Sequence, residues 1–317
     1  MRKENLKIAT LLIGLFISFY SYSQQDAQYT QYMYNMSIIN PAYATNQPGN
    51  LELGGLYRSQ WVGAVGGPTT GTFFLHSPLS KRVEVGTSII HDEIGGVVKE
   101  TNFFVDFAYL LKLGVNQHIS FGIKAGGNFY ATNFDGFVLN DATPDPSFEN
   151  NVSKIFPNIG VGTFYFSKNY YLGLSMPNLI RSKHLDEKNG IYNIGTEEIH
   201  YFLTGGYVFN INDNLKLKPA FMAKSAPSAP ASLSITGNVL LYNRVEFGIG
   251  YQLEDSFSGL VNFTVTPSLR IGYAYDKTIS NLGPFNSGSH EVILLYNFKN
   301  KLFKNNENGY DKSPRFF

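Results

Sequence analysis

Cysteine is absent from the 317 residues of the chain, and tryptophan occurs only once. Without cysteine there can be no disulfide framework, thiol nucleophile or thiolate metal site. Charged residues are also scarce, at 15% of the chain against about a quarter in an average soluble domain. The 25 Lys and Arg nearly balance the 24 Asp and Glu, so the chain lacks the broad basic field of a nucleic-acid-binding protein.

Aromatic residues and glycine are abundant instead, with 26 Phe, 21 Tyr and 31 Gly. So many large apolar side chains exclude an intrinsically disordered chain. After the first 23 residues, no apolar run approaches the length of about 20 residues that a transmembrane helix needs. Residence in a membrane would therefore require a closed barrel of strands. The composition favours an all-β protein with more apolar surface than one soluble core needs.

The first 23 residues have the pattern of a secretory signal peptide. A basic start is followed by the apolar residues 8–20 and by the small residues of Ser21-Tyr22-Ser23. An N-terminal membrane anchor is the alternative, but the apolar run is short for a span of about 20 residues. We expect cleavage after Ser23 and export of the chain.

Apolar and polar residues alternate with a period of two through most of the remaining chain. For example, Leu269, Ile271 and Tyr273 share one face, and Arg270 and Gly272 share the other. Fourteen such segments have roughly the length of a transmembrane β-strand. They begin near Leu51, Thr72, Val83, Thr101, Gln117, Pro157, Tyr170, Glu198, Leu215, Ala231, Arg244, Phe257, Leu269 and His290.

The connections between these segments differ in length. Those after even-numbered segments are tight, whereas residues 131–156, 177–197 and 277–289 form long links after odd-numbered segments. Short periplasmic turns and long extracellular loops are typical of outer-membrane barrels. We therefore predict an all-β fold, a transmembrane up-and-down antiparallel β-barrel of about 14 strands. The even strand number leads us to expect both mature chain ends in the periplasm.

The pattern divides the chain into four parts. These are a signal peptide (1–23), an N-terminal segment (24–50), an outer-membrane β-barrel (51–298) and a polar C-terminal tail (299–317). Two aromatic residues are candidates for the barrel-assembly signal. Phe298 ends a strand, and Phe317 ends the chain.

Residues 29–44 are too rich in Asn, Gln and Pro for a membrane strand, yet their large apolar side chains would be costly to leave in water. Two roles remain open: a plug packed inside the barrel, or a docking element for a periplasmic or secreted partner. An exposed Trp beside Arg at the outer end of the first strand is typical of an interface anchor and adds companion candidates. The candidate residues are Tyr32, Met33, Tyr34, Asn40, Pro41, Tyr43, Arg58, Gln60 and Trp61.

Several charged residues alternate with the lipid-facing positions and are therefore expected to point into the barrel. A barrel of about 14 strands is wide enough for a lumen that is plugged or that carries a solute. The charges would form a structural network that fills the lumen, or would line a channel for a hydrophobic or charged solute. They are Asp106, Lys124, Lys216, Lys218, Lys224, Glu246, Arg270 and Glu291.

The start of the mature chain resembles the opening motif of the PorP/SprF family of type IX secretion membrane proteins. The matching stretches are Gln31-Tyr32-Met33-Tyr34-Asn35 and Ile39-Asn40-Pro41-Ala42-Tyr43-Ala44. The likeness covers almost the whole mature chain and departs from the family in residues 300–317. It continues through Tyr57-Arg58-Ser59-Gln60-Trp61-Val62-Gly63, Asp92-Glu93-Ile94-Gly95, Pro157-Asn158-Ile159-Gly160-Val161-Gly162 and Tyr171-Leu172-Gly173-Leu174-Ser175-Met176-Pro177-Asn178-Leu179.

This resemblance implies an outer-membrane β-barrel that serves type IX secretion and, in gliding bacteria, the delivery or attachment of large cell-surface adhesins. The implied partners are the C-terminal domain of a secreted adhesin-like client, other type IX secretion components and the lipid bilayer, with no nucleic acid. The resemblance implies neither a cofactor nor a catalytic site. An outer-membrane channel for passive uptake of a hydrophobic or small charged solute is the alternative function.

The sequence gives little support to catalysis. His91-Asp92-Glu93 is the tightest polar cluster and the candidate metal or acid–base site. A simpler interpretation is a group of polar residues where a strand leaves the bilayer. The Gly-x-Ser-x-Gly pattern of a serine nucleophile is missing. We expect a protein that is not an enzyme.

Overall fold

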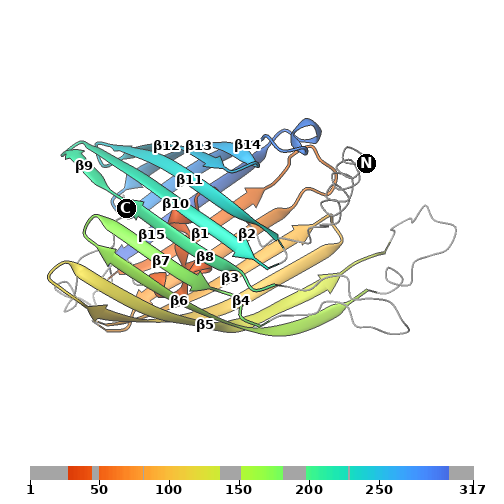
Figure 1. Ribbon diagram of the computed structural model, residues 1–317. Helices are drawn as coiled ribbons and strands as arrows, with labels where there is room; N and C mark the ends of the chain where they lie inside the picture. The colour runs from red at the N-terminus through yellow and green to blue at the C-terminus, as the bar shows by residue number, and fades with distance from the viewer. Residues whose placement is uncertain are drawn as a thin grey trace, which may run out of the picture.

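The structure, a computed structural model, describes residues 28–44, 50–80, 82–135, 151–180, 198–227 and 229–299. Most of these residues belong to one antiparallel sheet that closes on itself (Figure 1). Neighbours along the chain pair with each other, and the first strand pairs with the last to complete the barrel. The prediction of an up-and-down barrel is therefore confirmed. No helix in the described ranges has the length and apolar character needed to cross a bilayer.

Within the described ranges the barrel wall has fourteen strands, because β8 and β9 form one strand interrupted at Val208. The elements are β1 (Asn50–Ser59), β2 (Thr69–Pro78), β3 (Val83–Ile94), β4 (Val98–Lys112), β5 (Gln117–Thr132), β6 (Ser153–Ser167), β7 (Tyr170–Met176), β8 (Tyr201–Tyr207), β9 (Phe209–Asn212), β10 (Leu215–Ala226), β11 (Ala229–Leu241), β12 (Val245–Gln252), β13 (Ser256–Thr266), β14 (Leu269–Thr278) and β15 (Ser289–Lys299).

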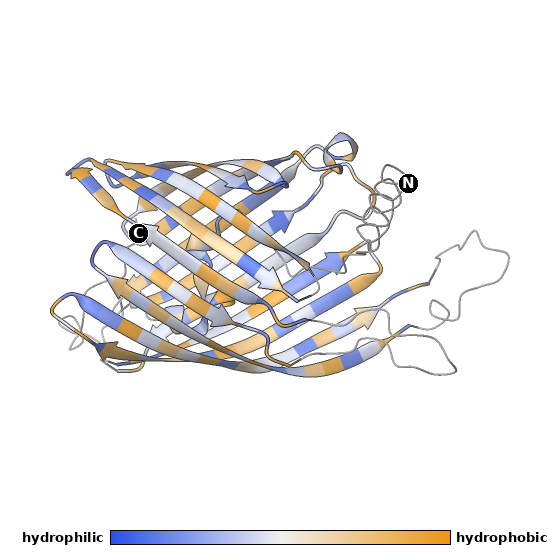
Figure 2. Cartoon of the chain, viewed as in Figure 1, coloured by the Kyte–Doolittle hydropathy of each residue, from blue (hydrophilic) through white to orange (hydrophobic). Residues whose placement is uncertain are grey.

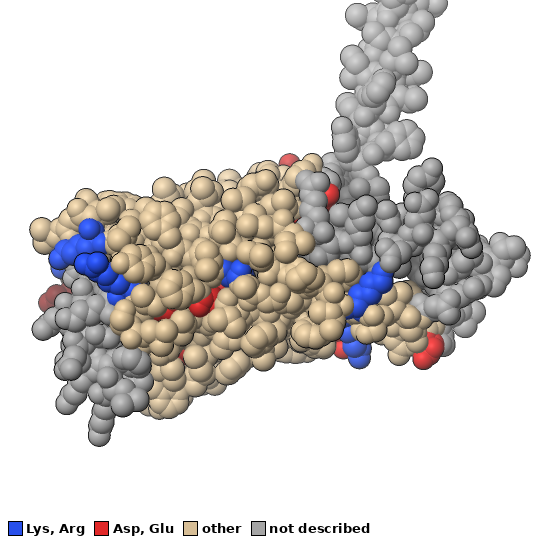
Figure 3. Space-filling view, turned by 90° about the horizontal axis from the view of Figure 1, so that it is seen from below, with Lys and Arg blue, Asp and Glu red and all other residues tan. Residues whose placement is uncertain are grey.

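The strands alternate between an apolar outer face and a more polar inner face, as the period of two requires. On β12, Phe247 and Ile249 are 52% and 73% exposed, whereas Glu246 between two outward residues is fully buried. Figure 2 shows this alternation of hydrophilic and hydrophobic residues along the strands. In the view of Figure 3, most charged side chains lie toward the two ends of the barrel. Such a surface suits a protein surrounded by lipid.

The two ends of the barrel differ. At the end that we call the turn end, six connections have two to four residues, for example residues 168–169 between β6 and β7. At the opposite end, the loop end, residues 60–68, 133–152, 177–200 and 279–288 form longer connections. Asn50 and Lys299, the outermost strand residues, pair at the turn end. In outer-membrane barrels the turn end faces the periplasm and the loop end faces the exterior.

The inside of the barrel is occupied by the chain itself. Residues 28–44, which we call the lumen segment, form the short helices η1 (Tyr32–Tyr34), α2 (Met36–Ile39) and η2 (Pro41–Ala44) within the wall (Figure 1). Small wall residues make room for this segment. A Cβ atom at Gly122 would overlap the backbone of Ala42, and one at Gly162 would overlap the Asn40 side chain. The lumen segment thus forms the core of the described barrel.

Candidate functional site

The lumen segment runs along the inside of the barrel and is enclosed for most of its length. Every residue from Gln31 to Tyr43 is buried. At one end, Gln28 accepts a hydrogen bond of 2.9 Å from Gln252, the last residue of β12 at the loop end. At the other end, Tyr43 packs edge-on against Phe164 of β6, with ring centroids 4.6 Å apart. The polar contacts of this segment with the wall define the candidate site.

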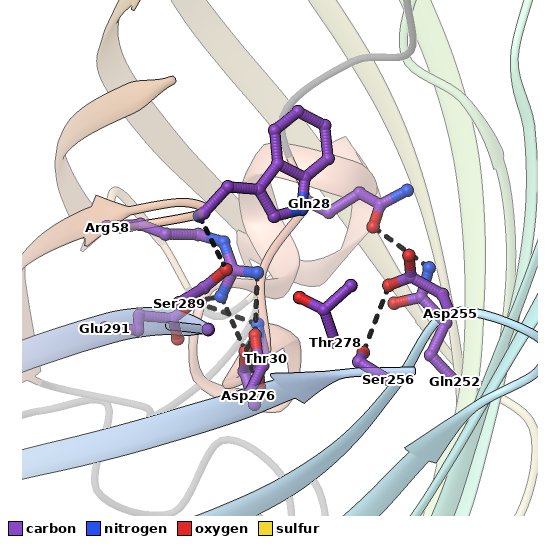
Figure 4. Close-up of polar contacts among 12 residues, drawn as sticks. Gln28, Thr30, Arg58, Gln252, Asp255, Ser256, Asp276, Thr278, Ser289 and Glu291 are labelled. Carbon is purple, nitrogen blue, oxygen red and sulfur yellow. Dashed lines mark hydrogen bonds and ion pairs between the residues drawn. The ribbon is translucent and has the colours of Figure 1, made fainter. Parts of the chain in front are cut away.

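The first group of contacts, the loop-end clamp, holds Thr30 and Gln31. The Glu291 carboxylate accepts hydrogen bonds from both backbone N–H groups, at 2.9 Å and 2.8 Å. The Thr30 hydroxyl lies 2.6 Å and 2.8 Å from the two carboxylate oxygens of Asp276. Arg58 completes the clamp with ion pairs of 2.7 Å to Asp276 and 3.2 Å to Glu291 (Figure 4). One guanidinium thus compensates two carboxylates in a place where unpaired charge would be costly.

Another acidic group lies beside the clamp, in a connection at the loop end of the barrel. Asp255 lies in the connection between β12 and β13 and accepts a hydrogen bond of 3.1 Å from Ser256 (Figure 4). Burial raises the pKa of the Asp255 carboxyl above its ordinary value, and the nearby Asp276 acts in the same direction. Asp255 is thus a third carboxyl group near Arg58, whose positive charge acts to lower its pKa again.

The second group of contacts surrounds Tyr34, deeper in the barrel. The Tyr34 hydroxyl donates a hydrogen bond to the carboxylate of Glu246. Glu246 also pairs with Arg270 at 3.1 Å and accepts a hydrogen bond from Asn262 at 3.3 Å. Two cations lie close to the ring of Tyr34, with Lys218 at 4.8 Å and Arg270 at 5.2 Å from its centroid. Such cation–π contacts are strongest where water is excluded.

The third group of contacts satisfies the C-terminal carbonyl groups of α2, which have no partners within the helix. Lys124 donates to the carbonyl oxygens of Ser37 at 3.2 Å and Ile38 at 2.8 Å. Ser175 donates to the carbonyl of Ile39 at 2.9 Å. Asp106, 3.8 Å from Lys124, supplies the opposite charge. The wall therefore replaces the hydrogen bonds that water would make to an exposed helix end.

The predicted lumen charges mostly lie inside the barrel. Five of them touch the lumen segment, whereas Asp106 acts through Lys124 and Lys224 lies 5.7 Å from the ring centroid of Phe202. Lys216 has the same inward register but lies near the turn end and is only half-buried. The residues that touch the segment are Lys124, Lys218, Glu246, Arg270 and Glu291.

The three residues of the predicted anchor lie in two different places: Arg58 is inside the barrel, and Gln60 and Trp61 are in the loop after β1. Arg58 is only 5% exposed and points into the barrel, because side chains alternate along β1. Arg58 therefore contacts the lumen segment and does not lie beside Trp61 in the loop. Trp61 is half-buried, and its backbone N–H donates to Ser289 at 3.2 Å. The Gln60 N–H donates to the Pro68 carbonyl at 2.8 Å, within the loop that follows β1.

The candidate residues of the lumen segment, from Tyr32 to Tyr43, are buried. Tyr32 and Met33 are 1% and 3% exposed, and Asn40 donates from its side chain to the Thr163 carbonyl at 3.0 Å. Pro41 and Tyr43 lie where the segment approaches the turn end. The clamp residues Thr30 and Asp276 were not predicted. Inward alternation on β14 could have identified Asp276, whereas Thr30 carries no sequence signal.

The cluster of His91, Asp92 and Glu93 does not converge on one point. His91 hydrogen-bonds to Thr101 at 2.8 Å, and Glu93 pairs with Lys99 at 3.7 Å on the exposed surface. In the described part of the chain, no group of three metal-ligating side chains is assembled. The expected signal peptide (1–23) and the tail beyond residue 299 lie outside the described residues.

Comparison with known proteins identifies a family. The family model described as type IX secretion system membrane protein PorP/SprF matches residues 21–296. No curated protein matches the chain.

Solved structures resemble the fold. A mutant of the monoaromatic hydrocarbon channel TodX is 10% identical, with a TM-score of 0.50, over 84% of this chain and 94% of that chain. The toluene transporter TbuX of Ralstonia pickettii is 10% identical, with a TM-score of 0.47, over 82% of this chain and 92% of that chain. An outer membrane protein of Acinetobacter baumannii is also 10% identical, with a TM-score of 0.45, over 80% of this chain and 99% of that chain. At such low identity the likeness concerns the fold alone.

Proposed function

This chain belongs to the PorP/SprF family of type IX secretion system membrane proteins, and we propose that it is a non-enzymatic outer-membrane partner for one secreted client. The client is a large adhesin-like protein, which the barrel binds through the client's C-terminal domain during secretion or surface attachment. Residues 1–23 serve as the signal peptide for export. The other partners are further components of the secretion and gliding machinery.

The observation that carries this proposal is the position of the family motif. The two stretches that begin the resemblance, Gln31–Asn35 and Ile39–Ala44, form most of the lumen segment. Their contacts reach the wall on several sides, through Glu291 on β15, Glu246 on β12, Lys124 on β5 and Ser175 on β7. A family motif that is buried inside its own barrel supports a role in fixing the shape of the barrel that a protein partner binds.

The same observation weighs against the alternative of a passive channel. A channel needs a water-filled path, and the described lumen segment lies across the barrel with thirteen consecutive buried residues, from Gln31 to Tyr43. Several of the inward charges form ion pairs, as Arg270 does with Glu246 and Lys124 with Asp106, rather than being left to attract a solute. We therefore assign these charges to the support of the lumen segment.

The proposed client meets the protein at the loop end. Type IX clients reach the outer face of the outer membrane, and the longer connections of the barrel lie at the same face. Trp61, half-buried in the loop after β1, is the candidate anchor there, because interface hot spots are enriched in Trp. Residues of the lumen segment act on this surface indirectly, through Arg58 at the end of β1.

Affinity purification from native outer membranes tests the proposal. The tagged protein should bring with it one secreted protein, retained through its C-terminal domain. Removal of the gene should eliminate that client from the cell surface and leave other type IX cargo in place. Uptake of a small solute that depends on the barrel, together with normal display of every surface protein, would favour the channel instead.

A further inference from the structure

The direction of the lumen segment follows from two contacts with a single strand. Gln28 contacts Gln252 at the loop end of β12, and Tyr34 contacts Glu246 near the turn end of the same strand. The two wall residues are six positions apart, which corresponds to about 20 Å along a strand at roughly 3.3 Å per residue. Between Gln28 and Tyr34, the chain therefore moves from the loop end toward the turn end.

The loop-end clamp gives the same direction independently. Thr30 contacts Arg58 and Asp276, which lie one and two residues from the loop-end limits of β1 and β14. Further along the chain, Tyr43 packs on Phe164, three residues from the turn-end limit of β6. β1 then starts at the turn end, where Asn50 pairs with Lys299. The lumen segment thus crosses the barrel once, from the loop end to the turn end.

We infer that the mature amino terminus lies at the outer face of the outer membrane. The lumen segment is a crossing in addition to the fourteen strands, so the number of described crossings is odd, and Gln28 and Lys299 lie at opposite ends of the barrel. The expectation of two periplasmic termini counted the strands alone, and this inference replaces it for the amino-terminal end. If the signal peptide ends at Ser23, the mature amino terminus is separated from Gln28 by only four residues.

Two consequences follow for assembly and for partners. If the mature amino terminus is outside, the seam between β1 and β15 must close around a segment that is already inside, since that segment starts at the loop end. Gln28 lies at the loop end, so a partner outside the cell reaches the start of the lumen segment first. This inference rests on the outer-membrane location and is independent of whether a client binds.

Single cysteines test the inference, because the chain contains none of its own. Asp26→Cys places a thiol ahead of the lumen segment. Asn281→Cys, in the exposed connection between β14 and β15, is the loop-end control, and Lys168→Cys, in an exposed turn, is the turn-end control. Each variant is treated in intact cells with a membrane-impermeant maleimide, and again after the outer membrane is permeabilised.

We expect Asp26→Cys to label in intact cells to the same extent as Asn281→Cys, while Lys168→Cys stays at background until permeabilisation. Background labelling of Asp26→Cys in intact cells overturns the inference, whatever happens after permeabilisation. A second measurement places an epitope tag and a protease site after Gln24. Protease added to intact cells should remove the tag and leave the heat-modifiable barrel in the membrane. A tag that survives until permeabilisation contradicts the inference. Purification of the client remains a separate test of the proposed function.

Discussion

Tyr34 and Glu246 are 212 residues apart in the sequence and meet inside the barrel, where the Tyr34 hydroxyl donates a hydrogen bond to the Glu246 carboxylate. The contact joins the first family motif to the turn-end part of β12. Glu246 is fully buried, pairs with Arg270 and accepts a hydrogen bond from Asn262. The buried charge of Glu246 on β12 thus has a structural role, because it holds Tyr34 of the lumen segment.

Removal of the Tyr34 hydroxyl should weaken this contact without removing the charge pair. Tyr34→Phe should reduce stability by about 1–3 kcal/mol, because a buried acceptor loses a donor. The midpoint temperature of the heat-modifiable mobility shift measures this change. Tyr242→Phe, at a 70% exposed turn residue, is the matched control and should leave the midpoint unchanged. Equal midpoints for both variants would show that the Tyr34 contact does not support the barrel.

Removal of Arg58 should have a larger effect, since Asp276 and Glu291 would remain buried without their shared cation. Breaking such a buried ion pair from one side costs about 3–5 kcal/mol. Arg58→Met should therefore lower the midpoint and free the start of the lumen segment for proteolysis at the loop end. Lys99→Met removes the exposed pair with Glu93, which contributes about 1 kcal/mol at most. If Arg58→Met and Lys99→Met gave the same proteolysis pattern, Arg58 would not hold the start of the lumen segment in place.

Close packing between wall and segment makes a third prediction. Gly122→Ala should displace the lumen segment, because the added Cβ atom would overlap the Ala42 backbone. Gly71→Ala is the control, since a Cβ atom there meets nothing within 4 Å. In planar bilayers, Gly122→Ala should raise ion conductance above that of the unmodified protein, whereas Gly71→Ala should not. Unchanged conductance in an assembled Gly122→Ala barrel would mean that the segment does not obstruct the lumen.

The outward register makes a fourth prediction. Ile249, 73% exposed in the middle of β12, should face hydrocarbon. Ile249→Arg should cost about 2–4 kcal/mol if the residue lies near the bilayer midplane, and it should reduce the amount of assembled barrel. Ile249→Leu keeps the apolar character and should assemble normally. If the Arg variant assembled as well as the Leu variant, the assignment of this face to lipid would be wrong.

The loop-end anchor makes a fifth prediction, on the client alone. Trp61→Ala should assemble normally and reduce surface display of the client, because a large aromatic contact is lost. Val65→Ala changes a fully exposed residue of the same loop and should have no effect. Surface labelling of the client in intact cells measures both variants. Equal display in both would leave Trp61 with a structural role.

Much of the wall could be predicted from the sequence, for a physical reason. Lipid outside and a polar lumen inside impose the period of two that places Ile249 outward and Glu246 inward. The same alternation assigns Asp106 and Lys124 to the inner face, where the register sets them opposite each other. Local alternation suffices for such positions because each strand meets the same two environments.

The contacts of the lumen segment could not be predicted in this way. Thr30 meets Asp276 across 246 residues of sequence, and no periodicity in a short irregular segment shows which strand it faces. Arg58 was grouped with its neighbour Trp61 as a candidate interface anchor, although alternation along β1 turns it inward. The direction of the segment depends on how the closed wall surrounds it, which counting strands does not reveal.

The central claim is that the lumen segment serves a secreted client. Its most direct test is the amount of client at the surface of cells whose barrel lacks residues 28–43. Only preparations in which the shortened barrel reaches the outer membrane and keeps its heat-modifiable mobility are compared with the full-length protein. We predict that the client disappears from the surface while other type IX cargo remains. Normal display of the client on cells with the assembled, shortened barrel would contradict the claim.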